Sequence, residues 1–583
     1  MVRAVLVASR YPGQPNRLDA FRDVLNRKLA GDNIQPRPPA FVSHAGLSMA
    51  LLNPSDAVRM HGASIAIGTL LDPRGDWHVP KAPLPDGSYA LLRADDAHVE
   101  LVADSVGSRT LWYALTDQEL IVSSSQRAIV TLLGSFEPNR GALPWMLSSG
   151  TLGPTAAWDA RLHRLQPGER LLLDRARWRL ERKLEVVEFA ADDSASHDAQ
   201  LERLRAAVEG ACHRWSFEPR KWVLTLSGGA DSRSLLCLLR HRGIKTVTWG
   251  LPESTEEPGN DAQVARQLAA TAGVPHRFFP IDSRTSAPEV VLERFLAAGE
   301  GRVARISGYV DGFHIWKTLF EEGYDGVVRG DEAFGSIPVS SPYDARCTAS
   351  LTTLADFFSA EECETFELPE QPLPERLGRG PQETLATWRD RLYQQFRVPT
   401  LLAGLTDLKT AYVDVGTPLL SGSVLECVRR LPDALRTEKQ LWRDLVSGLL
   451  PDVALATRVA IPSLTDFVAD RRVLTLLLDE LASEHATSLF PPLLRARVCA
   501  ALRAELRAPV NTSRAGREAW RLNALSRAVP ARLRAAVRSL RITRPTIEPL
   551  VLAFRAFVAT RMHALLRKDA ATKSASFEPA INA

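Results

Sequence analysis

The sequence has little cysteine, and the cysteines that it has follow no recognisable pattern. Six occur in 583 residues, and none forms a CxxC pair or a metal-ligand spacing. Scattered thiols of this kind indicate a reducing compartment rather than a disulfide framework or a structural zinc site. We therefore expect a cytoplasmic protein with free thiols.

The sequence also lacks a charge bias and a long apolar run. Lys and Arg number 72 against 68 acidic residues, a formal net charge of +4, which over this length predicts no nucleic-acid partner. The apolar part of the N-terminal MVRAVLVASRYPG is too short for a signal peptide, and no run of about eighteen uncharged apolar residues predicts a transmembrane segment. The amphipathic, basic VLAFRAFVATRMHALLRK near residue 551 is expected to pack against the rest of the protein.

Internal repeats are absent as well, and the length exceeds what one compact core normally supports. The first third is rich in short strand patterns, VRAVLVA, HVELVAD and LWYAL, with turn signals such as Pro85-Asp86-Gly87. A polar stretch, ERKLEVVEFAADDSASHDAQ, then leads into a helical pattern near residue 198. We predict two domains, 1–195 and 196–583.

Strand and helix patterns alternate after this boundary. KWVLTL, KTVTWG and HRFFPID are typical of strands, and SRSLLCLLRHR and DAQVARQLAATAG of helices. Such alternation predicts an α/β domain with a parallel sheet covered by helices. Beyond about residue 400 the pattern is nearly all helical, and the polar end KDAATKSASFEPAINA is expected to be disordered.

The most informative segment is KWVLTLSGGADSRSLLCLLR, which begins at Lys221. Gly228 and Gly229 lack a Cβ, so backbone N–H groups in this turn can approach a phosphate at the positive end of the following helix. No Gly-Lys-Ser/Thr follows, which excludes a Walker-type loop. Asp231 lies inside the loop, and a carboxylate beside phosphates is tolerable mainly when Mg²⁺ lies between them. A plain Gly-Gly turn between a strand and a helix is the simpler alternative.

This Ser227-to-Ser232 motif resembles the pyrophosphate loop of the ATP pyrophosphatase superfamily, whose members split ATP between its α and β phosphates. YDGVVRGDEAFG, with Asp331 after an apolar strand, is similar to the second metal-binding loop of asparagine synthetase and its relatives, although Gly-Asp-Glu is also a common surface turn. The resemblance covers most of residues 196 to 465. It implies that ATP and Mg²⁺ bind here, with Asp231 and Asp331 as the metal ligands.

The same resemblance implies the remaining site residues. The expected nucleotide-binding residues are Leu226, Ser227, Gly228, Gly229, Asp231, Ser232, Gly250 and Gly330. Lys439, Arg458 and Arg329 are the candidates for stabilising charge on the reacting groups, although each could equally be a solvated surface cation. Relatives often carry a lysine two residues past the arginine that corresponds to Arg458, where this chain has Ala460.

The N-terminal third is similar to the glutamine amidotransferase domain of the same family, an Ntn-type sandwich. Its Asp-x-x-Gly-x-Arg-x-Leu-x-Tyr pattern matches Asp104, Gly107, Arg109, Leu111 and Tyr113. Glutaminases of this class use a cysteine at position 2 as the nucleophile, whereas this sequence has Val2 and no cysteine before Cys212. We therefore expect no glutamine hydrolysis, and the amine must come from the substrate.

Among relatives that take their amine from the substrate, the chain most resembles lasso peptide cyclases. The loop before Asp331 carries neither the Tyr of β-lactam-forming enzymes nor the Glu of asparagine synthetases. A peptide α-amine has a pKa of about 7.7 to 8, so it needs less help from a base than a more basic amine. The expectation is macrolactam formation in a precursor peptide, with a leader peptidase and a leader-binding protein as partners. A β-lactam synthetase-like ligase and a catalytically silent peptide-binding protein remain the alternatives.

Overall fold

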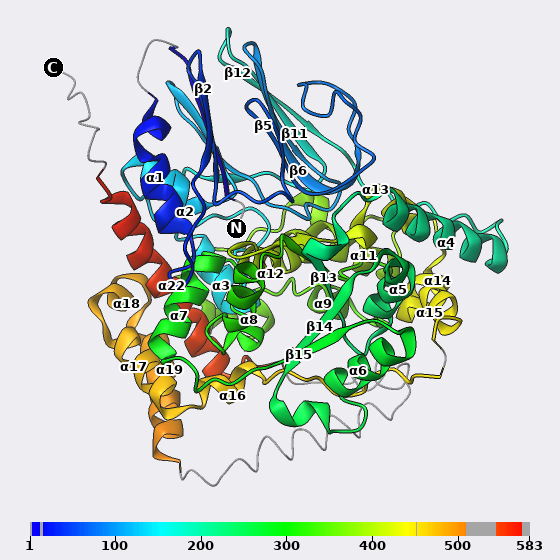
Figure 1. Cartoon of the computed structure of the whole chain (residues 1–583). Helices are drawn as coiled ribbons and strands as arrows, with labels where there is room; N and C mark the ends of the chain where they lie inside the picture. The colour runs from blue at the N-terminus through cyan, green and yellow to red at the C-terminus, as the bar shows by residue number, and fades with distance from the viewer. Residues whose placement is uncertain (1–2, 12–15, 451, 509–543, 574–583) are drawn as a thin grey trace.

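The computed structural model describes residues 3–11, 16–450, 452–508 and 544–573. It is a mixed α/β structure in which an antiparallel β-sandwich packs on a parallel sheet that helices surround (Figure 1). Val2 and the last ten residues of the polar C-terminal segment lie outside the described residues, so the expectations for them are not tested.

The sandwich is formed by two six-stranded sheets, with strand orders β10-β8-β9-β1-β3-β2 and β12-β11-β7-β6-β5-β4. Alternate residues of the strands face each other across the sandwich and bury apolar side chains such as Leu6, Met49, Ile67 and Leu101. The strands of the first sheet are β1 (Arg3–Ser9), β2 (Ala40–His44), β3 (Leu47–Leu52), β8 (Trp112–Leu115), β9 (Glu119–Ser123) and β10 (His163–Arg164). Those of the second are β4 (Arg59–His61), β5 (Ser64–Leu71), β6 (Asp86–Ala94), β7 (His98–Ala103), β11 (Glu169–Asp174) and β12 (Arg179–Leu184).

The predicted parallel sheet is confirmed. Its five strands have the order β15-β14-β13-β16-β17, and every neighbouring pair is parallel. They are β13 (Trp222–Thr225), β14 (Lys245–Gly250), β15 (His276–Pro280), β16 (Gly326–Val328) and β17 (Asp414–Gly416). β17 lies in the part of the chain whose pattern is almost entirely helical, and its three residues are too short to give a strand signal. The order places β13 at the centre, where two crossovers of opposite direction begin.

Helices pack against the β-sandwich, against the parallel sheet and at the junction between the two. Those that follow the sandwich strands are α1 (Arg17–Leu29), α2 (Gln126–Leu133) and α3 (Ala142–Ser149). Those of the α/β part are α4 (His197–Arg214), α5 (Ala230–Leu239), α6 (Asp261–Ala272), α7 (Pro288–Gly299), α8 (His314–Glu321), α9 (Pro342–Thr348), α10 (Ala360–Thr365), α11 (Leu385–Leu392), α12 (Ala403–Thr410), α13 (Gly422–Arg429), α14 (Asp433–Arg436) and α15 (Gln440–Ser447). The later ones are α16 (Leu464–Val468), α17 (Arg471–Ala482), α18 (Glu484–Leu489), α19 (Pro492–Arg507) and α22 (Pro549–Ala570).

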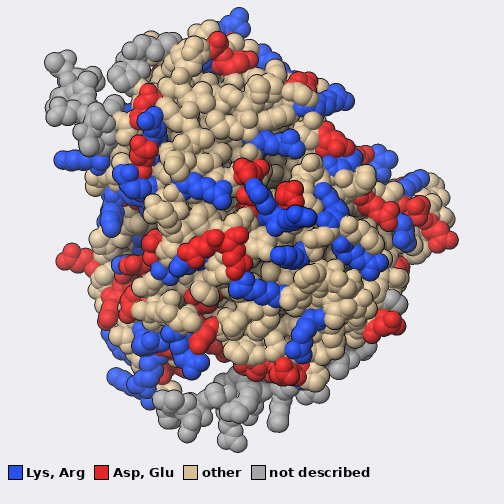
Figure 2. Space-filling model, viewed as in Figure 1, with Lys and Arg blue, Asp and Glu red and all other residues tan. Residues whose placement is uncertain are grey.

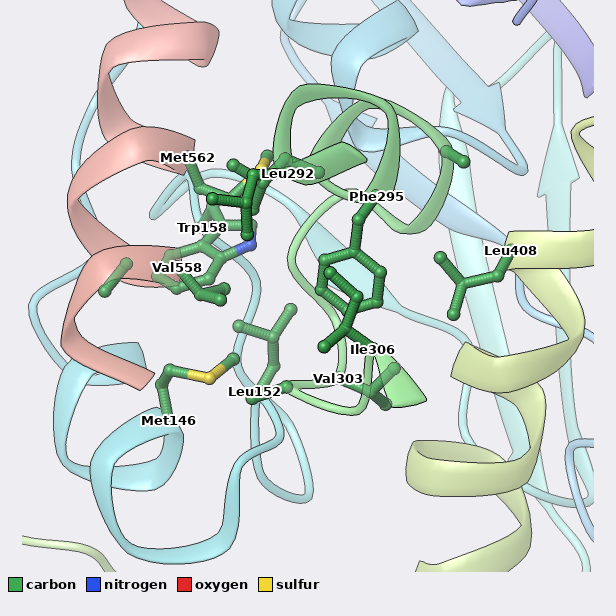
Figure 3. Close-up of a cluster of buried hydrophobic side chains, with 14 of the residues drawn as sticks. Met146, Leu152, Trp158, Leu292, Phe295, Val303, Ile306, Leu408, Val558 and Met562 are labelled. Carbon is green, nitrogen blue, oxygen red and sulfur yellow. The ribbon is translucent and has the colours of Figure 1, made fainter. Parts of the chain in front are cut away.

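β12 ends at Leu184 and α4 begins at His197, with Ser196 as its N-cap, on either side of the predicted domain boundary at residue 195. The two parts nevertheless share a hydrophobic core. Figure 3 shows Met146 and Trp158 from the first part packed with Phe295, Val558 and Met562 from the second. The two predicted domains therefore pack tightly against each other, because one apolar cluster includes residues of both.

Helix α22 is the central element of that junction. It contains the apolar segment near residue 551 and buries Phe554, Val558 and Met562 among others. By length and composition it could cross a membrane, but 61% of its most apolar window is buried inside the protein. Its contacts with α2, α3, α17 and α19 explain the apolar composition as core packing, as the sequence predicts.

Two further features are the distribution of charged side chains on one face and the state of the cysteines. On the face drawn in Figure 2, basic and acidic side chains are intermixed, with no large field of one sign. All six cysteines are free.

Candidate active site

A cavity of about 370 Å³ opens at the carboxyl ends of β13, β14 and β16. In parallel sheets, ligands bind in the crevice at these ends, where the strand order changes direction. Its lining includes the expected Leu226, Ser227, Asp231, Ser232, Arg329, Gly330 and Asp331. Residues 100 positions apart in the chain therefore border the same space.

The loop between β13 and α5 is closed by its own serines. The Ser227 N–H donates to Ser232 Oγ at 3.0 Å, and Ser232 Oγ donates to the Ser227 carbonyl at 3.1 Å. Gly229 is the N-cap of α5 and has no side-chain cap, so the first N–H groups of that helix remain directed toward the cavity. This end of a ten-residue helix can attract a phosphate through its dipole and its unpaired donors.

Gly228 is required for space rather than for an unusual dihedral angle. A Cβ on Gly228 would lie 2.4 Å from Ala456 Cβ and 2.9 Å from Val264 Cβ, although neither Gly228 nor Gly229 has a positive φ. Gly228 therefore permits a close approach of neighbouring segments and not a left-handed turn. The Gly228 N–H donates to Asp261 at the start of α6 at 3.2 Å, which orients this part of the loop.

The loop after β16 packs directly onto the first loop. A Cβ on Gly330 would lie 2.9 Å from the Asp231 carbonyl carbon and from the Ser232 nitrogen. Only a glycine permits this contact, because both neighbours are backbone atoms. Gly330 thus fixes the distance between the two loops that carry Asp231 and Asp331.

The two carboxylates fit the chemistry of a magnesium site only together with a ligand. Carboxylate and phosphate oxygens are the ligands that Mg²⁺ prefers. Within the described ranges, no group of three His, Cys, Asp or Glu side chains could hold a metal ion by itself. Asp231 and Asp331 could therefore hold Mg²⁺ if phosphate oxygens and water completed its shell.

Each carboxylate is held in place by a cation. Arg329 donates to Asp331 at 3.0 Å, and although burial acts in the opposite direction, this guanidinium keeps the pKa of Asp331 below its ordinary value. Asp231 accepts hydrogen bonds from Lys439 Nζ at 3.1 Å and from Trp442 Nε1 at 2.8 Å. The Asp331 carboxylate is thus stabilised as an anion, and the Asp231 carboxylate is oriented by two hydrogen-bond donors.

Lys439 lies behind the cavity rather than on its lining. Its ammonium bridges Asp231 and Glu332, with a 2.6 Å contact to Glu332. Burial opposes its charge, yet Glu332 and Asp231 together raise the pKa of Lys439. Its position favours a role in orienting Asp231 over direct contact with a reacting group.

The segment at 456–461 forms the opposite wall. It is tied to the loop and to α6 by backbone hydrogen bonds, including Ala456 N–H to Gly228 O at 3.0 Å and Asp261 N–H to Arg458 O at 2.9 Å. Ala460 borders the cavity and packs against Gly250, where an added Cβ would lie 2.5 Å from Ala460 Cβ. Arg458 is exposed, and neither it nor Gly250 belongs to the lining residues of the cavity.

This geometry places a nucleotide-sized cavity between two acidic loops at the end of a parallel sheet. Residues 203–327 match the asparagine synthase family model. The matched segment contains β13 and the Ser227-to-Ser232 loop, and it ends within β16, four residues before Asp331. This part of the chain is therefore similar to the asparagine synthase family, and the rest of the chain lies outside the match.

Two solved structures are also similar to the chain, at low identity. A glutamine phosphoribosylpyrophosphate amidotransferase from B. subtilis, complexed with ADP and GMP, matches at 7% identity and TM-score 0.20, over 48% of this chain and 91% of that chain. An allosteric regulatory enzyme of purine biosynthesis matches at 12% identity and TM-score 0.18, over 49% of this chain and 61% of that one. These scores carry no argument about fold or function. The comparison with curated proteins finds no match.

The amidotransferase-like pattern of the N-terminal part organises a turn and a domain contact. Asp104 accepts hydrogen bonds from the N–H groups of Tyr89, Val106 and Ser108 at 2.7 to 3.1 Å. Arg109 is buried and donates to the Val415 carbonyl of β17. Asp104 therefore fixes a turn within the sandwich, and Arg109 connects the sandwich to the parallel sheet.

Several residues that border the cavities are not among the site residues predicted from the sequence. Trp249, Asp261 and Thr248 border the cavity from β14 and α6. Lys409 borders a second cavity beside it, from α12. The sequence signal for Lys409 is a single lysine in a helix that also contains Thr406, Asp407 and Thr410, which is not specific.

Proposed function

We propose that the protein is an ATP-dependent amide ligase that activates a carboxylate as an acyl adenylate and joins it to an amine of the same peptide. The observation that carries this proposal is the packing of Gly330 on Asp231 and Ser232, which unites the two acidic loops at one cavity. Mg²⁺ held by Asp231 and Asp331 would neutralise the charge of the nucleotide phosphates. The proposed product is a macrolactam in a ribosomal precursor peptide.

In the first step, a side-chain carboxylate oxygen attacks the α-phosphorus of ATP. The new bond joins carboxylate oxygen to the α-phosphorus, and the bond to the β-phosphate oxygen breaks and releases pyrophosphate. The Ser227-to-Ser232 loop and the start of α5 would stabilise the charge that develops on this leaving group.

In the second step, the peptide's N-terminal amine attacks the acyl carbon. The carbon–nitrogen bond forms, the carbon–oxygen bond to AMP breaks, and the nitrogen loses one proton to solvent. A neutral α-amine is available near pH 7 without a strong base. Tyr309, the nearest tyrosine to the second cavity, is not suited to this role because burial raises the pKa of its phenol. Positioning would thus supply most of the rate in this step.

The amine source follows from the same proposal. Residues 1–211 contain no cysteine, and Asp104 and Arg109 are used in the turn and in the contact with β17. Both observations favour an amine supplied by the substrate over ammonia from glutamine. A leader peptidase, a leader-binding protein and a cytoplasmic location remain expectations of the proposed pathway.

A ligase for a small amino acid, of the β-lactam synthetase kind, is the second candidate. The cavity beside the nucleotide cavity measures about 470 Å³, a size that holds one small molecule as readily as a peptide side chain. A silent peptide-binding protein would have no need of two acidic loops held at a fixed distance.

Pyrophosphate release tests the proposal. The protein is incubated with Mg²⁺ and ATP, with and without a precursor peptide carrying Asp or Glu at position seven to nine of its core. We expect peptide-dependent release and a product lighter by one water in mass spectrometry. Asp231→Asn and Asp331→Asn should abolish both signals, with Asp193→Asn, an exposed carboxylate outside the site, as the matched control. Absence of release from the unaltered protein with every acidic substrate class would refute ligase activity.

A further inference from the structure

A second cavity, of about 470 Å³, adjoins the candidate nucleotide cavity. The two share Trp249, Arg329 and Ile461 in their linings, so they meet at this point. The second cavity is bordered by the end of α3, the segment 304–309, α12 and α22. Its walls therefore come from both halves of the chain and from the C-terminal helix.

The hydrophobic cluster of Figure 3 holds these walls in position. Val303, Ile306, Leu408 and Val558 belong to the cluster, and they stand beside or near the cavity-lining residues in sequence. Gly299 allows Leu408 to approach closely, since a Cβ there would lie 2.7 Å from Leu408 Cδ2. The cavity is thus lined by the polar neighbours of a packed core and should keep its shape without a ligand.

The charge of the second cavity is of one sign. Its lining contains four cationic side chains and no acidic one: Arg305, Arg329, Lys409 and Arg555. Arg329 is already paired with Asp331, and Arg555 donates to the carbonyls of Leu147 and Ser148 at 2.9 and 2.8 Å. Arg305 is exposed at the rim.

Lys409 is the side chain whose surroundings call for a ligand. It is 3% exposed, and its ammonium donates to the Leu405 carbonyl at 2.7 Å. The rings of Tyr309 and Trp316 lie 5.6 and 5.7 Å away, and no Asp or Glu of the described residues lies within ion-pair distance. An ammonium has three donors, so two remain for another acceptor.

A buried ammonium without a counter-ion is unfavourable. Burial and then the charge of Arg329 lower the pKa of Lys409 well below its ordinary value, against the weaker opposite effect of the more distant Asp331 and Asp407. A carboxylate that entered the cavity would give the ammonium a counter-ion and restore its favourable charged state. Fold stability alone therefore gives no reason for a lysine at this position.

We propose that the second cavity binds the substrate carboxylate that is to be adenylated, and that Lys409 is its direct ligand. This inference rests on the proposed function and adds the place and the chemical class of the second substrate. The carboxylate would lie beside Arg329, where the two cavities meet, which directs it toward the nucleotide. Arg305, at the rim of the cavity, would attract the substrate carboxylate more weakly than Lys409 does.

Binding of a small carboxylate tests the proposal without the natural peptide. The probe is the α-amide of N-acetyl-L-glutamate, whose side-chain carboxylate is its single ionisable group, and the α-amide of N-acetyl-L-glutamine is the neutral control of the same shape. We expect the glutamate α-amide at millimolar concentration to raise the melting temperature of the unaltered protein and the glutamine α-amide to have no effect. Lys409→Met should weaken the carboxylate effect roughly 10- to 100-fold, and Arg305→Ala about 3- to 10-fold. Lys183→Met, an exposed lysine of β12, is the matched control and should bind as the unaltered protein does.

The unliganded stability of Lys409→Met distinguishes a binding role from a structural one. If Lys409 serves to bind a ligand, Lys409→Met should be as stable as the unaltered protein or more stable, because the variant removes a buried charge that has no counter-ion. Loss of stability or failure to fold would overturn the proposal. Equal carboxylate binding by Lys409→Met would also overturn it. Mg-ATP binding is measured in parallel: if it is absent while the carboxylate effect of Lys409 persists, the proposed ligase function fails and the carboxylate site stands.

Discussion

Replacing Gly330 by alanine should separate the two acidic loops. The added Cβ would lie 2.9 Å from two backbone atoms of the first loop and 3.1 Å from Asp231 Cβ. Unstrained carbon contacts lie at about 3.5 to 4.0 Å, so the loops must move apart by roughly 0.6 to 1 Å. Backbone atoms cannot rotate out of the way as a flexible side chain could.

The energetic cost of this change should be local. Overpacking typically costs about 1 to 3 kcal/mol, which a protein with an unfolding free energy of about 5 to 15 kcal/mol survives. A displacement of about 1 Å at reacting groups can lower a rate about 100-fold. We therefore expect Gly330→Ala to remain folded and to lose about 10- to 100-fold in Mg-ATP affinity or in pyrophosphate release.

Calorimetric titration with Mg-ATP and a thermal unfolding scan measure the two effects separately. Gly448→Ala is the matched control, because a Cβ there would meet no atom within 4 Å and its φ is −77°. If Gly330→Ala bound Mg-ATP as tightly as the Gly448→Ala protein, the contact between the loops would not define the nucleotide site. The reasoning that joins Asp231 to Asp331 would then be wrong.

Three further changes test the buried charges. Lys439→Met leaves two acidic neighbours without their shared cation and should lower the unfolding free energy by about 3 kcal/mol in a denaturant titration; an unchanged midpoint would contradict this. Asp569→Asn breaks the fully buried contact with Arg127, at 2.7 Å, and should cost about 3 to 5 kcal/mol in the same assay. Burial lowers the pKa of His563 to about 4 in the native protein. As the pH falls, the unfolded chain therefore binds a proton near pH 6.5, whereas the native protein binds it near pH 4. Stability should fall by up to about 3 kcal/mol between these pH values, and His563→Phe should remove that part of the pH dependence.

The two loops could be identified from the sequence because their chemistry is local. The Ser227-to-Ser232 segment joins a strand to a helix, and the required residue types are consecutive. Asp331 follows a strand in the same way. Since parallel strands end at one edge of a sheet, their common location followed from the predicted fold class.

The cationic candidates show where this reasoning stops. Arg329 borders the cavity as the sequence analysis expects, whereas Lys439 lies behind Asp231 and Arg458 is exposed beside the wall. All three are plain basic residues in sequence. Their distance from the cavity depends on helix packing and on the path of the 456–461 segment, which no local pattern encodes.

Lys409 is a cavity-lining residue that the sequence analysis did not predict. It is delivered by a helical run in which a π-helical stretch, Tyr393–Leu402, contains Pro399 and leads into α12. Proline lacks an N–H, and the widened turn accommodates it without ending the helix. The direction in which Lys409 points is thus set by this irregular turn and by the core around Leu408.

The sequence by itself determined the composition class, the β-rich and α/β parts, and the two acidic loops, because strand periodicity and loop chemistry act between near neighbours in the chain. The tertiary structure decided the spacing of those loops through Gly330, the burial of Lys439, and the second cavity with Lys409. These features depend on contacts between residues about 100 or more positions apart, and only the packed core fixes such contacts.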